Sequence, residues 1–161
     1  MAGPRLLLAA FGLGLGLASA SACEPPGSCE EDLRAQVLDA QVSVDADGQV
    51  FDAELATTQV ERERGWKHRA CDRRALLLLA APVSEGEPSL AVWGCGLSEA
   101  VDAHWIFDGE VTAVEIIEPC AEPCEGCPSL GADWPADAVL ELGPEFEGDA
   151  PLPVGAAISW Q

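Results

Sequence analysis

Cysteines are the residues of this chain whose type and spacing could most readily do chemistry, and there are seven of them. Cys120, Cys124 and Cys127 form a local cluster, with three and then two residues between neighbours. Thiolates at this spacing could bind zinc together with Cys95 or His104, and the last two could act as a redox dithiol. In an oxidising compartment the same residues would form disulfides, which is the interpretation we favour.

The N-terminal residues predict export. Met1–Arg5 carries one positive charge, and an apolar run over 6–17, too short to span a bilayer, leads into small residues. The segment Ala20-Ser21-Ala22-Cys23 resembles the bacterial lipobox, in which a peptidase cuts before the cysteine and a diacylglycerol is attached to its sulfur. The resemblance implies a signal peptide over 1–22 and a membrane partner reached through a lipid anchor on Cys23.

The residue after the lipobox indicates where the protein is sent. Glu24 stands where an aspartate would favour retention at the inner membrane. The resemblance therefore implies an outer-membrane lipoprotein that faces the periplasm or the cell surface. The alternative is ordinary cleavage near Ala20 or Ala22, which would give a secreted soluble protein with Cys23 in a disulfide.

The number of cysteines favours lipidation. Without Cys23 an even number of thiols remains, and exported chains tend to pair their thiols. The disulfide candidates are Cys29, Cys71, Cys95, Cys120, Cys124 and Cys127. The sequence does not fix the pairs, but we expect one bridge within residues 120–127 and one that uses Cys95.

The charge of the chain excludes one class of partner. Its 161 residues suit about one domain, and 8 basic against 28 acidic residues give a net charge of −20. Removal of residues 1–22 would leave 7 basic residues and the same 28 acids, a net charge of −21. A nucleic-acid partner needs a basic face, so we exclude it. The sequence has no phosphate loop, dinucleotide glycine pattern or catalytic serine or zinc motif, so we expect no cofactor and no metal.

One segment departs from this acidity. Residues 61–74 carry a net charge of +3 and include Arg69, Arg73 and Arg74. These arginines could bind anionic headgroups, a polysaccharide or an acidic envelope protein. The interpretation we favour is that they form ion pairs within the domain.

Carboxylates offer a candidate catalytic site. Asp102 lies near Trp93 in the sequence, and with Asp108 or Glu115 it could form the acid pair of a sugar-cleaving enzyme. Chance pairs are expected among 28 acids, so we expect no catalysis at this site.

The tryptophans divide between strands and loops. Trp93, Trp105 and Trp160 fall on predicted strands, where we expect them in the core. Trp134 lies in a loop, where its ring could contact a sugar. His104 alternates with Trp105 and is expected to be structural or exposed rather than catalytic.

Most of the predicted elements are strands. Alternating apolar residues over 36–44 and 50–55, on either side of a turn at 45–48, predict a β-hairpin. A loop rich in Pro, Gly and Cys is expected over 118–135. Further strands are expected over 76–79, 90–93, 104–107, 111–117, 139–142 and 156–160.

The predicted helix is short. Thr58 and Glu61 form a capping box that begins a helix at about 58–66. About seven to eight short strands with one short helix predict a mainly β fold, a small barrel or sandwich. We expect a flexible tether over 23–35 and a single domain over 36–161.

The order of these motifs resembles that of a bacterial and archaeal family, domain of unknown function 192 (DUF192), over about residues 36–160. Residues 56–66 resemble its A-D-T-P-E-E-R-A-R-G-L-M segment, and 92–102 resemble its hallmark F-W-M-K-N-T-x-x-P-L-D. The loop at 118–124 resembles P-C-x-x-x-P-C, and 139–142 is V-L-E-L. The positions that match the two long motifs include Arg62, Arg64, Gly65, Trp93 and Asp102.

The departures from the family pattern bear on function. Gly94, Cys95 and Gly96 stand where the hallmark has Met, Lys and Asn, so any activity of that Lys and Asn is expected to be lost. The family has no established reaction, and we expect a non-catalytic, lipid-anchored envelope domain that is stabilised by disulfides and serves a binding or structural role. The alternatives are an envelope enzyme or accessory acting on carbohydrate near Trp93 and Asp102, and a metal or redox site built from cysteines.

Overall fold

The computed structural model describes residues 32–70, 75–143, 146 and 152–161. The predicted signal peptide and the lipidation site lie outside the described residues, as do Cys29, Cys71, Arg73 and Arg74. The described part is mainly β, as the sequence predicts, with one short α-helix.

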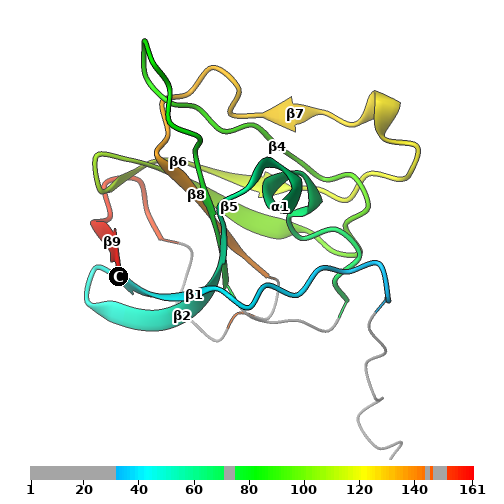
Figure 1. Cartoon of the computed structure of the whole chain (residues 1–161), viewed down its shortest axis with the longest axis horizontal. Helices are drawn as coiled ribbons and strands as arrows, with labels where there is room; N and C mark the ends of the chain where they lie inside the picture. The colour runs from blue at the N-terminus through cyan, green and yellow to red at the C-terminus, as the bar shows by residue number, and fades with distance from the viewer. Residues whose placement is uncertain (1–31, 71–74, 144–145, 147–151) are drawn as a thin grey trace, which may run out of the picture.

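Seven strands form one curled sheet in the order β6-β5-β8-β3-β2-β1-β9. Their bounds are β1 (Gln41–Ala46), β2 (Gln49–Ala56), β3 (Ala75–Leu79), β5 (Val101–Phe107), β6 (Glu110–Ile117), β8 (Ala138–Leu142) and β9 (Ile158–Trp160). A separate antiparallel pair joins β4 (Val92–Trp93) to β7 (Ser129–Leu130). Figure 1 shows the curl of the large sheet, with β7 toward the top of the view and α1 (Gln59–Arg64) below β4.

The predicted hairpin is confirmed as β1 and β2. Its turn is tighter than expected, because Ala46 pairs with Gln49 and two residues make the connection. Asp47 and Gly48 both have positive φ, 51° and 89°, which is the conformation that a two-residue hairpin turn requires. The backbone N–H of Gly48 also donates to the Asp45 carboxylate at 2.8 Å, which fixes the turn.

The predicted helix is confirmed as α1. The Thr58 hydroxyl accepts from the Glu61 backbone N–H at 3.2 Å, and the Glu61 carboxylate accepts from the Thr58 N–H at 2.8 Å. These hydrogen bonds hold the pKa of Glu61 below its usual value, since they favour the charged form. Gly65 ends the helix with a φ of 46°, and its N–H donates to the Glu61 carbonyl at 2.9 Å.

Each face of the sheet carries its own apolar cluster. The inner cluster draws residues from all seven strands, among them Val44, Leu77 and Leu140. The other face, here called the helix-side face, packs Leu76, Leu78 and Val139 against Trp66, Leu90 and Val92. Since successive side chains on a strand point to opposite faces, β3 is buried on both, as its leucine run predicts.

The sheet closes on itself at one end. The Val111 N–H at the start of β6 donates to the Ala156 carbonyl at 2.9 Å, and the Ile158 N–H donates to the Gly109 carbonyl at 2.8 Å. These bonds join the two edge strands β6 and β9, so that their edges are partly paired. The structure is therefore nearer to the predicted barrel than to a sandwich.

The loop expected over 118–135 contains more structure than the sequence indicates. It includes a turn of 3-10 helix (Cys124–Gly126) and strand β7. Only two residue pairs hold β7 to β4, a segment too short to show the alternation that marks a strand. None of the helices in the described residues is long and apolar enough to cross a membrane.

Candidate functional site: a pocket between α1 and β4

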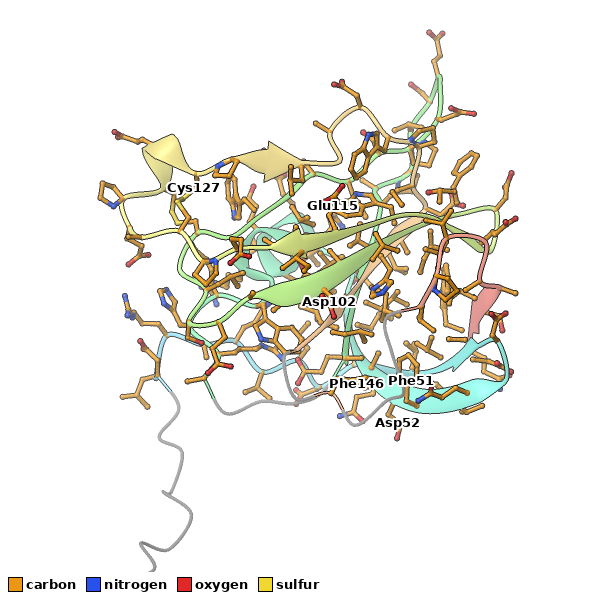
Figure 2. All side chains as sticks on the ribbon, turned by 180° about the vertical axis from the view of Figure 1, so that it is seen from behind. Phe51, Asp52, Asp102, Glu115, Cys127 and Phe146 are labelled. Carbon is orange, nitrogen blue, oxygen red and sulfur yellow. A yellow bond between two sulfur atoms is a disulfide. The ribbon has the colours of Figure 1, made fainter. Side chains whose placement is uncertain are left out.

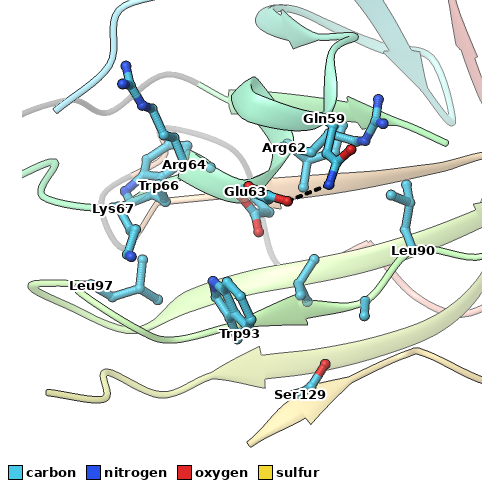
Figure 3. Close-up of a pocket in the computed structure, with 15 residues that line it drawn as sticks. Gln59, Arg62, Glu63, Arg64, Trp66, Lys67, Leu90, Trp93, Leu97 and Ser129 are labelled. Atoms are coloured by element: carbon cyan, nitrogen blue, oxygen red, sulfur yellow. Dashed lines mark hydrogen bonds between the residues drawn. The ribbon is translucent and has the colours of Figure 1, made fainter. Parts of the chain in front are cut away.

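A pocket of about 200 Å³ opens between helix α1 and strand β4. Figure 3 shows Trp93 on the strand side pointing toward the helix, with Glu63 and Lys67 reaching toward it from the helix side. Its apolar floor comes from the helix-side cluster, and its rim is polar and charged. The charged side chains and the tryptophan of strand β4 that line it are Arg62, Glu63, Arg64, Lys67, Trp93 and Glu141.

Glu141 places a carboxyl group at the floor of the pocket. It lies on β8 beside Leu76 of β3, in a sheet row that also contains Glu54 of β2. Its side chain is directed to the helix-side face and is only 5% exposed. Oε2 lies 3.7 Å from the position that a Cβ on Gly65 would take, which places the carboxyl beside the end of helix α1. Within the described residues Oε2 has no hydrogen-bond partner.

Burial sets the protonation of Glu141. Loss of solvent raises the pKa of its carboxyl to about 7, although the nearby Arg69 guanidinium acts in the opposite direction. The pocket therefore contains a carboxyl group that is partly protonated at neutral pH. Such a group can donate or accept a hydrogen bond, depending on what enters.

Arg69 is a structural residue. It is 1% exposed and donates to the Glu54 carboxylate at 2.5 Å, and Glu54 is equally buried. Its guanidinium also lies 5.2 Å from the ring centroid of Trp66. The sequence left open a surface role for Arg69, and the structure corrects this, because a buried ion pair is closed to an external anion.

The basic residues that remain at the rim come from α1 and the residues after it. Arg62 donates to the carbonyls of Thr57 and Leu79, at 2.5 and 3.1 Å, and so ties the helix to the end of β3. Arg64 is exposed, and the Lys67 ammonium lies 3.6 Å from the Cys124 sulfur. These three cations line the pocket in a strongly acidic protein.

The tryptophans correct one expectation. Trp93 is 43% exposed at the pocket, where the sequence predicted a core residue. A strand of two residues at the rim does not bury both faces. Trp134, whose ring the sequence left open as a sugar contact, is half-buried and packs edge-on against the fully buried Trp105, with centroids 4.8 Å apart. Trp160 is partly buried against the inner cluster.

Two disulfides lie beside the pocket. Cys95 pairs with Cys124, and Cys120 pairs with Cys127, which is the predicted arrangement of one bridge within the loop and one that uses Cys95. The paired sulfurs are not available as thiolate ligands, and among the described residues there is no group of side chains suited to a metal. Cys95 of the first bridge lies two residues after Trp93, so the bridge ties the strand side of the pocket to the cysteine-rich loop.

Asp102 does not form the candidate acid pair. It lies opposite Ile116 on β6, whereas Glu115 lies opposite Ala103, so the two carboxylates point to opposite faces of the sheet. Asp108 is at the other end of β5, roughly 20 Å along the strand. Asp102 does not line the pocket either. Figure 2 shows it on β5, with Glu115 on the neighbouring strand.

His104 is structural, one of the two alternatives left open. It is fully buried, and its Nδ1 lies 3.3 Å from the Leu140 carbonyl. Burial lowers the pKa of this imidazole, so the neutral form predominates at neutral pH.

Glu141 is the residue that sequence analysis missed. The V-L-E-L match identified its segment but not its role. A signal was present, because a single acid in a strand whose other residues are all apolar indicates a buried carboxyl. The family-motif positions Arg62, Arg64, Gly65 and Trp93 all line the same pocket, which the structure brings together from two distant segments.

The fold and the pocket define a small β domain with a cavity of about 200 Å³ against its helix. The chain belongs to the DUF192 family, described as "Uncharacterized ACR", whose model matches residues 41–160. No curated protein matches the sequence.

Two crystal structures share the fold. A "putative transcription regulator" from Sinorhizobium meliloti 1021 is 21% identical, with a TM-score of 0.60 over 78% of this chain and 97% of that one. A protein of unknown function from Novosphingobium aromaticivorans DSM 12444 is 24% identical, with a TM-score of 0.58 over 75% of this chain and 84% of that one. At these identities the likeness shows the fold alone.

Proposed function

We propose that this protein is a lipid-anchored domain of the cell envelope that binds a small ligand in the pocket between α1 and β4 and does not transform it. One observation carries the proposal. An exposed tryptophan, Trp93, and a buried carboxyl with an unpartnered oxygen, Glu141, line the same cavity. Cavities with apolar walls and a few convergent polar groups are the usual form of small-molecule sites.

The cost of burying Glu141 supports a binding role. An ionisable group without a hydrogen-bond partner destabilises the folded protein, and such groups persist mainly where function needs them. A ligand that brings a hydrogen-bond donor would remove part of that cost. Binding would then be favoured at an oxygen that the described residues leave unsatisfied.

The envelope location is supported by sequence and by cysteine chemistry. A lipobox-like segment ends at Cys23, and two disulfides suit an oxidising compartment. The intact mass of the protein purified from membranes tests this. We expect a diacylglyceryl adduct that Cys23→Ser removes. A soluble protein with an unmodified N-terminal cysteine would contradict the anchor.

Nuclear magnetic resonance of the tryptophan indole N–H groups tests the pocket. The mature protein would be titrated with phenol, cyclohexanol, benzoate and glucose at millimolar concentration, and the Trp93 signal assigned with Trp93→Phe. We expect at least one probe to shift the Trp93 signal in a saturable way while the buried Trp105 signal stays in place. Failure of every probe to shift Trp93 would contradict a ligand site.

A second candidate function is glycoside cleavage at the same pocket. The observation that favours it is a pair of carboxyl groups in different environments, Glu141 buried and Glu63 exposed. Sugar-cleaving enzymes use such pairs as acid and base. Hydrolysis of 4-nitrophenyl glycosides that is lost in Glu141→Gln would establish it, whereas binding without turnover would support the non-catalytic proposal.

A further inference from the structure

The chemistry of the pocket narrows the class of ligand, and this inference rests on the proposed binding function. The unpartnered Glu141 Oε2 needs a hydrogen-bonding group, since an apolar group placed against it would leave it unsatisfied, and when the carboxyl is ionised that group has to be a donor. Hydroxyl and ammonium groups are the two common donors in small molecules. The charges around the cavity decide between them.

Charge disfavours an ammonium group. Arg62, Arg64 and Lys67 line the cavity against the single exposed acid Glu63. Arg69 lies close enough to act on the Glu141 carboxyl from beneath. A cationic ligand would enter against this excess of positive charge, whereas an anionic group at the rim would be attracted. The donor at the floor is therefore a hydroxyl, and the rim suits a carboxylate.

The side chain of Trp93 adds a flat apolar surface. Its indole is 43% exposed on the strand side of the pocket, opposite the cations of the helix side. A saturated ring whose C–H groups form one apolar face can stack on this indole while its hydroxyls remain at the ring edge. The cavity volume of about 200 Å³ is below the usual range for drug-sized ligands and suits a single ring.

We propose that the pocket binds an acidic sugar, a pyranose ring that carries a carboxylate. The ring stacks on Trp93, one hydroxyl hydrogen-bonds to Glu141, and the carboxylate faces Arg64 and Lys67. Lys67 is held at this rim by its contact with Cys124. The sugar can be free or part of an envelope polysaccharide, because both present the same ring and charge.

Three small molecules separate the contributions that the hydroxyls and the carboxylate of the ligand make to binding. D-Galacturonate has the ring, the hydroxyls and the carboxylate, D-galactose lacks the carboxylate, and cyclohexanecarboxylate lacks the hydroxyls. We expect galacturonate to shift the Trp93 indole signal with at least tenfold lower Kd than either of the others. Equal affinity for galactose would overturn the acidic-sugar assignment, and saturable binding of any probe would still leave the proposed function in place.

Variants test the assigned contacts. Arg64→Gln with Lys67→Gln is expected to reduce galacturonate binding to the level of galactose without changing galactose binding. Glu141→Leu is expected to weaken both sugars at least tenfold. Arg34→Gln is the matched control, since Arg34 is exposed and paired with Asp32 and Glu122 outside the pocket. Unchanged galacturonate binding in the rim variant would overturn the proposal.

A trimer of galacturonate distinguishes the two sources. Tighter binding of the trimer than of the monomer would assign the ligand as a unit of an acidic polysaccharide. Equal or weaker binding would assign the free sugar. Absence of binding by both, with folding verified by circular dichroism, would overturn the proposal.

Discussion

At the scale of single residues, two buried glutamates in one sheet row have opposite roles. Glu54 is paired with Arg69, whereas burial raises the pKa of the Glu141 carboxyl to about 7. One therefore supports the fold and the other opposes it at neutral pH. The contrast agrees with the ligand-binding role that we propose for Glu141.

Glu141→Gln should stabilise the protein at alkaline pH. A carboxyl whose pKa is raised from 4.5 to about 7 binds protons more readily in the folded state, so stability falls as pH rises from about 4.5 to 7. The variant should gain about 3 kcal/mol over the native protein at pH 8 and nearly nothing at pH 4.5. Urea unfolding at the two pH values measures this. A loss of stability at pH 8 would contradict the account.

Glu54→Gln is the matched control for this prediction. It leaves the buried Arg69 guanidinium without its ion-pair partner, so we expect a loss of about 3–5 kcal/mol. Equal changes in the free energy of unfolding for Glu54→Gln and Glu141→Gln would contradict the opposite roles given to the two glutamates.

Replacement of the tryptophans of β4 and β5 should lower stability by different amounts. Trp105 is fully buried and its indole donates to the Leu90 carbonyl at 2.9 Å, so Trp105→Ala should cost about 3–5 kcal/mol. Trp93 is partly exposed, and Trp93→Ala should cost only about 1–2 kcal/mol. Thermal unfolding compares them. A larger loss for Trp93 would mean that its role is in the core, as the sequence first indicated.

At the scale of elements, local signals in the sequence were sufficient for the hairpin, the capped helix and the buried leucine strand. Each depends on residues that are close together in the sequence, such as Thr58 and Glu61. The parallel pairing of β2 with β3 and the short strand β7 could not be predicted, because they depend on contacts between distant segments. The pocket was missed for the same reason, since α1 and β4 come together only in the fold.

The glycines around Cys95 show how one element adapts to another. A Cβ on Gly94 would lie 1.7 Å from the Glu118 carbonyl oxygen, so the cysteine-rich loop can approach β4 only over a glycine. Gly96 has a φ of 74° and accepts from the His68 N–H at 2.8 Å. The departure from the family hallmark at 94–96 thus accommodates the loop and its bridge to Cys124.

The two disulfides should differ in their contribution to stability. The Cys95–Cys124 bridge spans 29 residues and the Cys120–Cys127 bridge spans 7. The longer loop loses more entropy in the unfolded chain, so replacing both cysteines by alanine should cost about 3–4 kcal/mol for the first bridge and about 2 for the second. Guanidinium unfolding of the two double variants measures the order. A larger loss of stability without the Cys120–Cys127 bridge would contradict this prediction.

At the scale of the whole molecule, the sheet is held closed by the joint between β6 and β9. Ile158 of β9 is 4% exposed in the inner cluster, while its neighbour Ser159 is exposed. Ile158→Ala should therefore cost about 2–5 kcal/mol, and Ser159→Ala should be nearly neutral. Chemical unfolding checks both. Unchanged stability in Ile158→Ala would show that the contact between β6 and β9 contributes little to the stability of the fold.

The proposal that the pocket binds an acidic sugar can be tested by a crystal structure of the mature protein grown with D-galacturonate. The account predicts one sugar ring between α1 and β4, stacked on Trp93, with a hydroxyl at the Glu141 carboxyl and its carboxylate toward Arg64 and Lys67. A sugar bound on any other surface, with the pocket empty, would contradict it.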